Sequence, residues 1–191
     1  MLADVALVSK TITHPFTLVG NPSTNGIDFG TLAVVNNLNV IKSGYFIWTG
    51  SGANAKYEVH DGDGEEIAAW RGFIVEKDEG GVLSFSPFLA SAPASLAKKA
   101  VKSLAAASEK LTITATNSTG SAYTLLKKSD KGKSTVGSND LSFLSTGAND
   151  YVQLYTVKPD NAGTKRNLAI NTLNSYEAQI PVGVQTTYNG T

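Results

Sequence analysis

Residues 72–85 read GFIVEKDEGGVLSF. Phe73-Ile74-Val75 and Val82-Leu83-Ser84-Phe85 are both rich in β-branched and aromatic residues. Between them stands Asp78-Glu79-Gly80-Gly81, whose glycines can adopt the positive φ that a tight turn requires. Two short β-prone runs joined by such a turn predict a β-hairpin.

Similar β-prone runs recur on both sides of this hairpin, separated by clusters of Gly, Asn, Asp and Ser. One cluster, Gly50-Ser51-Gly52-Ala53-Asn54, separates two such runs and predicts another turn between strands. This spacing is typical of an antiparallel β-sandwich or barrel and not of alternating βαβ units. The other predicted strands cover Val5–Thr11, Phe16–Val19, Gly44–Thr49, Lys56–His60, Leu111–Asn117, Ala122–Lys127, Tyr151–Thr156, Asn167–Ile170 and Glu177–Val184, and Ile27-Asp28-Phe29 is expected to start a short helix or a loop.

Residues 94–110 break the β pattern. Their sequence, ASLAKKAVKSLAAASEK, is rich in Ala, Leu and Lys, which are strong helix formers. We interpret this segment as a linker, either a short helix or irregular, between an N-terminal β half (1–93) and a C-terminal β half (111–191). The last residues resemble a turn entering a further strand, so we expect the second half to be truncated. The predicted fold is all-β, with two packed antiparallel halves.

The composition excludes several classes of site. The chain of 191 residues carries 16 basic and 16 acidic residues, so its charge gives no reason to expect a nucleic-acid partner. It contains no cysteine, which excludes disulfides and thiolate metal sites. No stretch approaches the roughly 20 apolar residues of a membrane-spanning helix, so we expect no membrane insertion.

Three aromatic residues, Trp48, Tyr57 and Trp70, are candidates for a ligand-binding surface, because flat apolar rings suit sugar rings. Trp48 ends the apolar run Tyr45-Phe46-Ile47-Trp48, which favours a strand covered on both faces. Trp70 precedes Gly72 in a predicted strand, which favours close packing. Core packing is therefore the leading interpretation for both tryptophans, and sugar stacking is the alternative.

The segment His60-Asp61-Gly62-Asp63-Gly64-Glu65-Glu66 gathers four carboxylates around a glycine-rich turn. Calcium prefers several such oxygens in a flexible loop, so Asp61, Asp63 and Glu65 are candidate ligands for Ca²⁺. The alternation of an EF-hand loop is absent, and a solvated β-turn is the favoured interpretation. The sequence predicts no other cofactor.

The residue patterns of common catalytic sites are missing from the sequence. His14 and His60 are isolated, and there is no G-x-S-x-G motif, phosphate-binding loop or H-E-x-x-H motif. We therefore expect a protein that is not an enzyme and has no catalytic residues.

Several motifs follow one another in a characteristic order: Phe16-Thr17-Leu18-Val19-Gly20-Asn21-Pro22, Gly44-Tyr45-Phe46-Ile47-Trp48, Ile67-Ala68-Ala69-Trp70-Arg71-Gly72-Phe73-Ile74-Val75, Leu168-Ala169-Ile170-Asn171 and Ile180-Pro181-Val182-Gly183-Val184. Their order resembles a β-sandwich region of secreted and cell-surface proteins of the Bacteroidetes. That region often precedes a C-terminal sorting domain of type IX secretion. The sequence departs from the usual pattern at Phe16, where Trp is usual, and at Arg71, where Gln is usual. The resemblance implies β architecture, secretion and surface display.

We therefore expect a non-catalytic, secreted or cell-surface β module with a structural, adhesive or domain-presenting role. One alternative is a carbohydrate-binding module of a secreted multidomain hydrolase. A second alternative is a subunit or substrate of a surface or secretion assembly. The expected partners are neighbouring domains of a larger chain, a polysaccharide or the secretion machinery. Two or more coplanar, exposed aromatic residues on one face would favour sugar binding, and buried tryptophans would favour the structural role. An exposed final strand, Glu177–Val184, would favour assembly.

Overall fold

The computed structural model describes residues 9–36, 39–50, 55–85, 109–117, 120–145, 152–176 and 179–186. Strands dominate these residues, with one short helix among them, so the predicted all-β class is confirmed. The chain divides into two compact units. The first comprises Met1–Ile47 and His60–Ala106, and the second comprises Trp48–Val59 and Ala107–Thr191.

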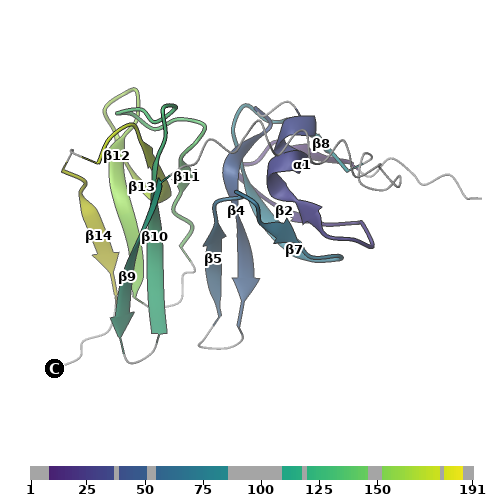
Figure 1. Ribbon diagram of the computed structural model, residues 1–191, viewed down its shortest axis with the longest axis horizontal. Helices are drawn as coiled ribbons and strands as arrows, with labels where there is room; N and C mark the ends of the chain where they lie inside the picture. The colour runs from purple at the N-terminus through teal and green to yellow at the C-terminus, as the bar shows by residue number, and fades with distance from the viewer. Residues whose placement is uncertain are drawn as a thin grey trace, which may run out of the picture. The chain divides into compact units, whose positions relative to one another are not determined.

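The core of the first unit lies on β2, β7 and β4 of a four-stranded sheet whose order is β2-β7-β4-β5 (Figure 1). Across its antiparallel pairs, Val19 faces Phe73 and Tyr45 faces Val75. Because side chains alternate along a strand, these four residues share one face of the sheet, and that face is buried. The strands are β2 (Phe16–Gly20), β7 (Gly72–Lys77), β4 (Ile41–Thr49) and β5 (Lys56–His60).

Short elements complete this core. They are the pair β1 (Ser9–Ile12) and β8 (Gly81–Ser84), the pair β3 (Ile27–Asp28) and β6 (Glu66–Ile67), and the helix α1 (Phe29–Val35). The helix begins where Asp28 Oδ1 accepts a hydrogen bond from the Thr31 N–H at 2.7 Å, which is a typical N-cap. Phe29 and Leu32 of the helix belong to the same buried cluster as Tyr45 and Phe73.

The hairpin predicted around Asp78–Gly81 is wrong. Strand β8 pairs with β1, whereas β7 pairs with β2 and β4. The backbone of the turn explains the difference, because the Asp78 N–H donates to Val40 O and the Glu79 N–H donates to Asn39 O. The chain is thus held against the segment before β4 instead of folding back on β7. The other predicted turn does connect neighbouring strands, since β4 and β5 are adjacent in the sheet.

The Gly20-Asn21-Pro22 motif is braced by a buried side chain. Asn21 Nδ2 donates hydrogen bonds to the backbone oxygens of Asn25, Ile67 and Ala68, each at 3.0 Å. Asn21 Oδ1 accepts a hydrogen bond from the Ser23 N–H at 2.9 Å. The motif therefore ties the end of β2 to the segment after β6, in agreement with its interpretation as a structural turn.

The second unit contains a curled, half-barrel sheet of six strands, whose order is β14-β12-β13-β10-β9, with β11 paired to β13 (Figure 1). Strand β13 is central, and its residues Leu168 to Thr172 are all buried. It pairs antiparallel with β12 and β11 and parallel with β10. The bounds are β9 Glu109–Asn117, β10 Gly120–Lys128, β11 Leu141–Ser142, β12 Gln153–Pro159, β13 Lys165–Leu173 and β14 Val182–Gln185.

The predicted linker over 94–110 falls outside the described residues, except for Glu109 and Lys110, which begin β9. The sequence prediction assigned Trp48–Val59 to the first half of the chain, whereas the structure groups it with the second unit.

Candidate functional site

Two of the predicted ligand-binding aromatics, Trp48 and Tyr57, contact each other in the second unit. Their ring centroids lie 4.7 Å apart, and the ring planes meet at 64°, an edge-to-face contact. The expectation of a core position for Trp48 is wrong, because its side chain is 46% exposed at the end of β4. The two rings do not form one flat platform.

The third aromatic, Trp70, lies in the turn before β7, in the first unit. It is 70% exposed, so the expectation of ordinary packing is also wrong. Its φ of 60° lies in the left-handed region, which a bulky side chain rarely adopts. Hydrogen bonds on both sides hold this backbone: the Arg71 N–H donates to Ala68 O, and the Asn21 N–H donates to Arg71 O. The turn thus fixes an indole ring toward solvent at the cost of strain.

The predicted calcium ligands are used for other contacts. Asp61 is buried, and its Oδ1 accepts a hydrogen bond from the Asp63 N–H at 3.1 Å. Glu65 Oε2 lies 2.6 Å from His60 Nδ1 and accepts a 3.3 Å hydrogen bond from the Tyr45 hydroxyl. Among the described residues, which include all three acids, no three His, Asp or Glu side chains gather closely enough to hold a metal ion.

His60, Glu65 and Tyr45 form a compact polar cluster beside the first core. The imidazole ring stacks on the Tyr45 ring with a centroid distance of 4.8 Å and an interplanar angle of 10°. Burial, followed by the nearby Glu65 carboxylate, raises the pKa of Tyr45 well above its ordinary value. Tyr45 therefore stays protonated and donates to Glu65, which makes the cluster a brace for the glycine-rich turn.

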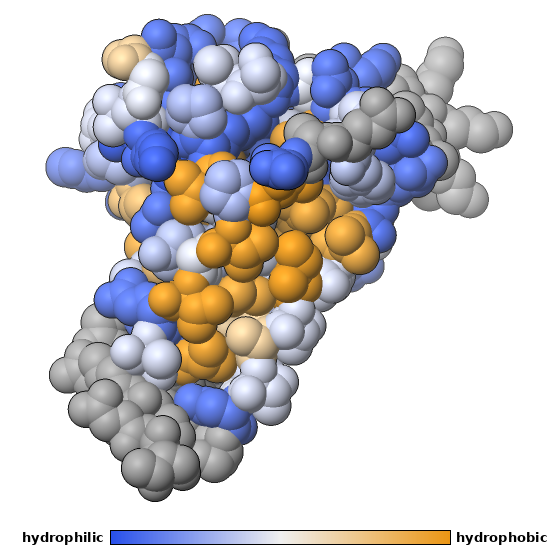
Figure 2. Space-filling model, turned by 90° about the vertical axis from the view of Figure 1, so that its left-hand side faces the viewer, coloured by the Kyte–Doolittle hydropathy of each residue, from blue (hydrophilic) through white to orange (hydrophobic). Residues whose placement is uncertain are grey.

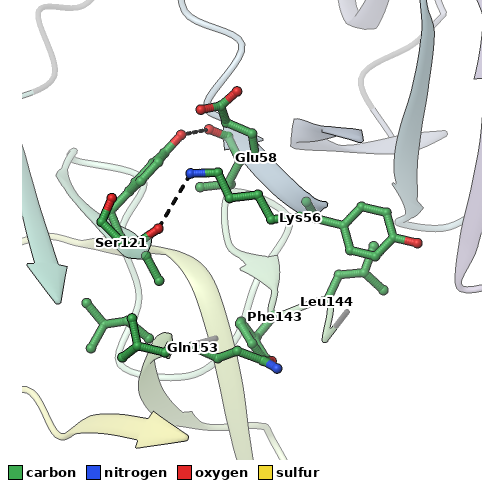
Figure 3. Close-up of a pocket in the computed structure, with 12 residues that line it drawn as sticks. Lys56, Glu58, Ser121, Phe143, Leu144 and Gln153 are labelled. Carbon is green, nitrogen blue, oxygen red and sulfur yellow. Dashed lines mark hydrogen bonds between the residues drawn. The ribbon is translucent and has the colours of Figure 1, made fainter. Parts of the chain in front are cut away.

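A small pocket lies within the second unit, between the Lys56–Val59 segment and strands β10 and β12 (Figure 3). Its volume of about 60 Å³ is several times what one water molecule needs. Lys56 Nζ lies 3.5 Å from Ser121 O, and the Tyr123 hydroxyl donates to Val59 O at 2.7 Å. The lining residues are Lys56, Tyr57, Glu58, Val59, Ser121, Ala122, Tyr123, Phe143, Leu144, Val152, Gln153 and Leu154.

Gln153 is a buried polar residue in the lining of this pocket. Its side chain is buried, and its Oε1 has no hydrogen-bond partner among the described residues. This oxygen has almost no accessible surface, so it is a buried unpaired acceptor and not a group open to the pocket. Lys56 and Glu58 add charged groups to an otherwise largely apolar lining, and Tyr57 links the pocket to the Trp48 contact.

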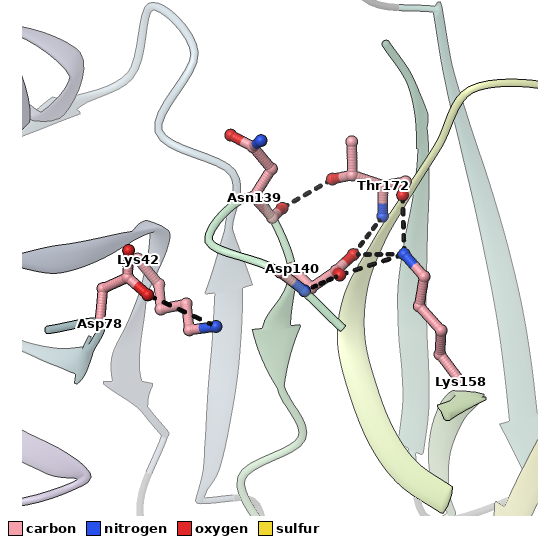
Figure 4. A network of polar contacts seen from close by, with 7 residues as sticks. Lys42, Asp78, Asn139, Asp140, Lys158 and Thr172 are labelled. Atoms are coloured by element: carbon pink, nitrogen blue, oxygen red, sulfur yellow. Dashed lines mark hydrogen bonds and ion pairs between the residues drawn. The ribbon is translucent and has the colours of Figure 1, made fainter. Parts of the chain in front are cut away.

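A buried ion pair, which sequence reasoning missed, holds the loop before β11 (Figure 4). Lys158 Nζ lies 3.1 Å from both carboxylate oxygens of Asp140 and donates to Thr172 O at 2.8 Å. Asp140 also accepts hydrogen bonds from the Thr172 and Gly137 N–H groups. The sequence contained a sign of this buried lysine. Lys158 stands at every second position with Leu154 and Thr156, so the three side chains share the inward face of the strand.

Large apolar side chains gather on the side of the second unit that Figure 2 shows. Of the described residues of this unit, Leu111 on β9 is 51% exposed, and Val182 and Val184 on β14 are 45% and 56% exposed. Strands β9 and β14 are the two edges of the six-stranded sheet. We call Leu111, Val182 and Val184 the edge patch. The sequence predicted strands over Leu111–Asn117 and Glu177–Val184, but it did not predict that Leu111 is exposed.

The described part of the chain contains no helix long and apolar enough to cross a membrane. No protein-family profile matches the sequence, and neither the curated proteins nor the solved structures contain a significant match.

Proposed function

We propose that this chain is a non-catalytic, secreted or cell-surface β module with an adhesive role, and that it contacts its partner through the edge patch. The observation that carries the proposal is the exposure of Leu111, Val182 and Val184 on both edge strands of one sheet. Exposed apolar groups beside unpaired strand edges are typical of surfaces that bind another protein. Secretion and surface display come into the proposal from the sequence resemblance.

Several conspicuous polar groups of the described residues serve the scaffold, which agrees with this proposal. Asn21 braces the turn after β2, Glu65 binds His60 and Tyr45, and Asp140 binds Lys158. The edge strands expose Leu111, Val182 and Val184 beside uncharged threonines, and the charges of β9 are confined to one end. Adhesion by apolar burial and strand pairing fits these surfaces better than recognition of a charged ligand.

Carbohydrate binding is the second candidate function. The exposure of both tryptophans favours it, because an exposed indole ring can stack on a sugar ring. The 64° angle between Trp48 and Tyr57 weighs against a flat stacking platform.

One bead assay separates the two functions. Beads coated with the protein are scored for clustering with one another and for retention on polysaccharide-coated surfaces. The adhesive role predicts clustering that is lost in the L111K/V182K/V184K variant and kept in Trp70→Ala. Retention on a polysaccharide that is lost in Trp70→Ala or Trp48→Ala would support sugar binding instead. Beads that neither cluster nor bind any polysaccharide would contradict both proposals.

A further inference from the structure

Strand β9 presents a long edge with a partner on one side. It pairs with β10 over nine consecutive positions, from Asn117↔Gly120 to Glu109↔Lys128, without a bulge. Within the described parts of the chain, no strand pairs with the other edge of β9. Every second backbone N–H and C=O of an edge strand points outward, so this edge can accept another strand.

The sequence of β9, EKLTITATN, carries few of the features that protect edge strands from pairing. It contains no proline, glycine or bulge, and its charged residues are confined to Glu109 and Lys110 at one end. Glu109 is already paired with Lys128 across the strands, at 3.4 Å. By contrast, β14 spans only four residues, and the Tyr155 ring covers its Gly183. The edge of β9 is therefore the better template for strand addition.

We propose that a second copy of this chain pairs with β9 along this edge, antiparallel and centred on Ile113. The proposal rests on the adhesive role proposed above and names its partner. The sequence of β9 is nearly self-complementary about Ile113. In this register Leu111 faces Ala115 of the other copy, Thr112 faces Thr114, and Ile113 faces itself.

This register follows from three properties of the strand. Odd-numbered residues face odd-numbered ones in this register, and even-numbered residues face even-numbered ones. The apolar residues of both copies therefore lie on one face, and the threonines lie on the other. The register pairs all nine residues, which a shift by two positions does not. It also sets Glu109 opposite Asn117 and Lys110 opposite Thr116, so that no like charges face each other. The pairing would cover Leu111, which is half exposed in the single chain.

Zero formal net charge leaves no overall repulsion between two copies. A short extended peptide from another protein could also pair with this edge of β9. Its binding would not depend on a two-fold axis at Ile113, because its sequence differs from that of β9. The position of the two-fold axis is thus the feature that separates a second copy from other partners.

Exposed threonines allow a test that leaves the core untouched, because Thr112 and Thr114 point to solvent. In T112K/T114K each lysine faces a lysine of the other copy, so we expect the dimer dissociation constant to rise about tenfold or more. The T112E/T114E variant should behave alike. An equimolar mixture of the two should dimerise as the wild type does, and the single chain T112K/T114E should dimerise at least as well.

Sedimentation equilibrium measures these constants over a wide concentration range, with circular dichroism to check the fold. The matched control is S134K/S138K, which adds the same charge at exposed positions of the same unit. A monomeric wild type, or equal effects of T112K/T114K and S134K/S138K, would overturn the proposal. If the beads of the previous assay cluster while the Thr112 and Thr114 variants leave the dimer dissociation constant unchanged, the adhesive role is supported and the β9 register about Ile113 is contradicted. If neither clustering nor dimerisation occurs, both fall.

Discussion

The side chain of Asn21 makes more hydrogen bonds within the first unit than its position in a turn suggests. It is 2% exposed, and its amide satisfies three backbone oxygens and one N–H group. Asn21→Asp sets a carboxylate oxygen against the oxygens of Asn25, Ile67 and Ala68. We expect a loss of about 2–4 kcal/mol in the free energy of unfolding by urea. Asn25→Ala, at an exposed position, should change it by less than about 0.5 kcal/mol, and equal losses would contradict this role.

Trp70 is the residue at which backbone strain is visible. Its φ of 60° is unfavourable for any residue with a Cβ atom and favourable for glycine. We expect Trp70→Gly to be more stable than Trp70→Ala by about 1 kcal/mol in thermal or urea unfolding. Both substitutions remove the exposed indole ring, so the comparison isolates the backbone. An alanine variant as stable as the glycine variant would show that the turn is not strained.

At the scale of elements, the Asp140–Lys158 pair fastens the β11 loop to β12 and β13. Both side chains are nearly fully buried, so a lone charge left behind would be costly. Lys158→Met should lower the free energy of unfolding by about 3–5 kcal/mol, and the double variant D140L/K158M should lose less than the sum of its single variants. A loss below about 1 kcal/mol in Lys158→Met would contradict a tightly coupled pair.

The turn between β12 and β13 depends on the ionised form of Asp160. A hydrogen bond from the Thr164 N–H, helped by Arg166 and the Ala162 N–H, lowers the pKa of Asp160 below its ordinary value of 3.8. Because the pKa of Asp160 is lowered in the folded protein, ionised Asp160 stabilises the turn at pH values above 3.8. The turn loses this support as the pH falls through the lowered pKa. We expect the Ala162 and Thr164 amide resonances to titrate together with a midpoint below 3.8. A midpoint at or above that value would contradict the pairing.

Periodicity predicted the strands well, because alternation and turn residues are local properties of the sequence. The predicted strands at Lys56–His60 and Phe16–Val19 match β5 and β2 within one residue. Pairing is a long-range property, which explains the error at Asp78–Gly81, where backbone bonds to Asn39 and Val40 redirect the chain. The exposure of Trp70 could not be predicted either, because it depends on one positive φ angle.

At the scale of the whole molecule, the boundary between the units does not follow the sequence order. Trp48–Val59 groups with the second unit, although the residues on both of its sides belong to the first. The Tyr123–Val59 hydrogen bond and the pocket around Lys56 both form because Trp48–Val59 belongs to the second unit. Composition alone marks the alanine-rich segment at 94–110 as a linker and gives no sign that an earlier segment joins the second unit.

Adhesion through β9 should be visible in the hydrogen exchange of the backbone amides of this strand. Exchange is measured by mass spectrometry at several protein concentrations. Pairing with a second copy predicts that amides within Glu109–Asn117 become more protected as the concentration rises, and that T112K/T114K abolishes this dependence. Amides of the central strand β13 should show no such change. Protection of β9 that is the same at every concentration would contradict the account.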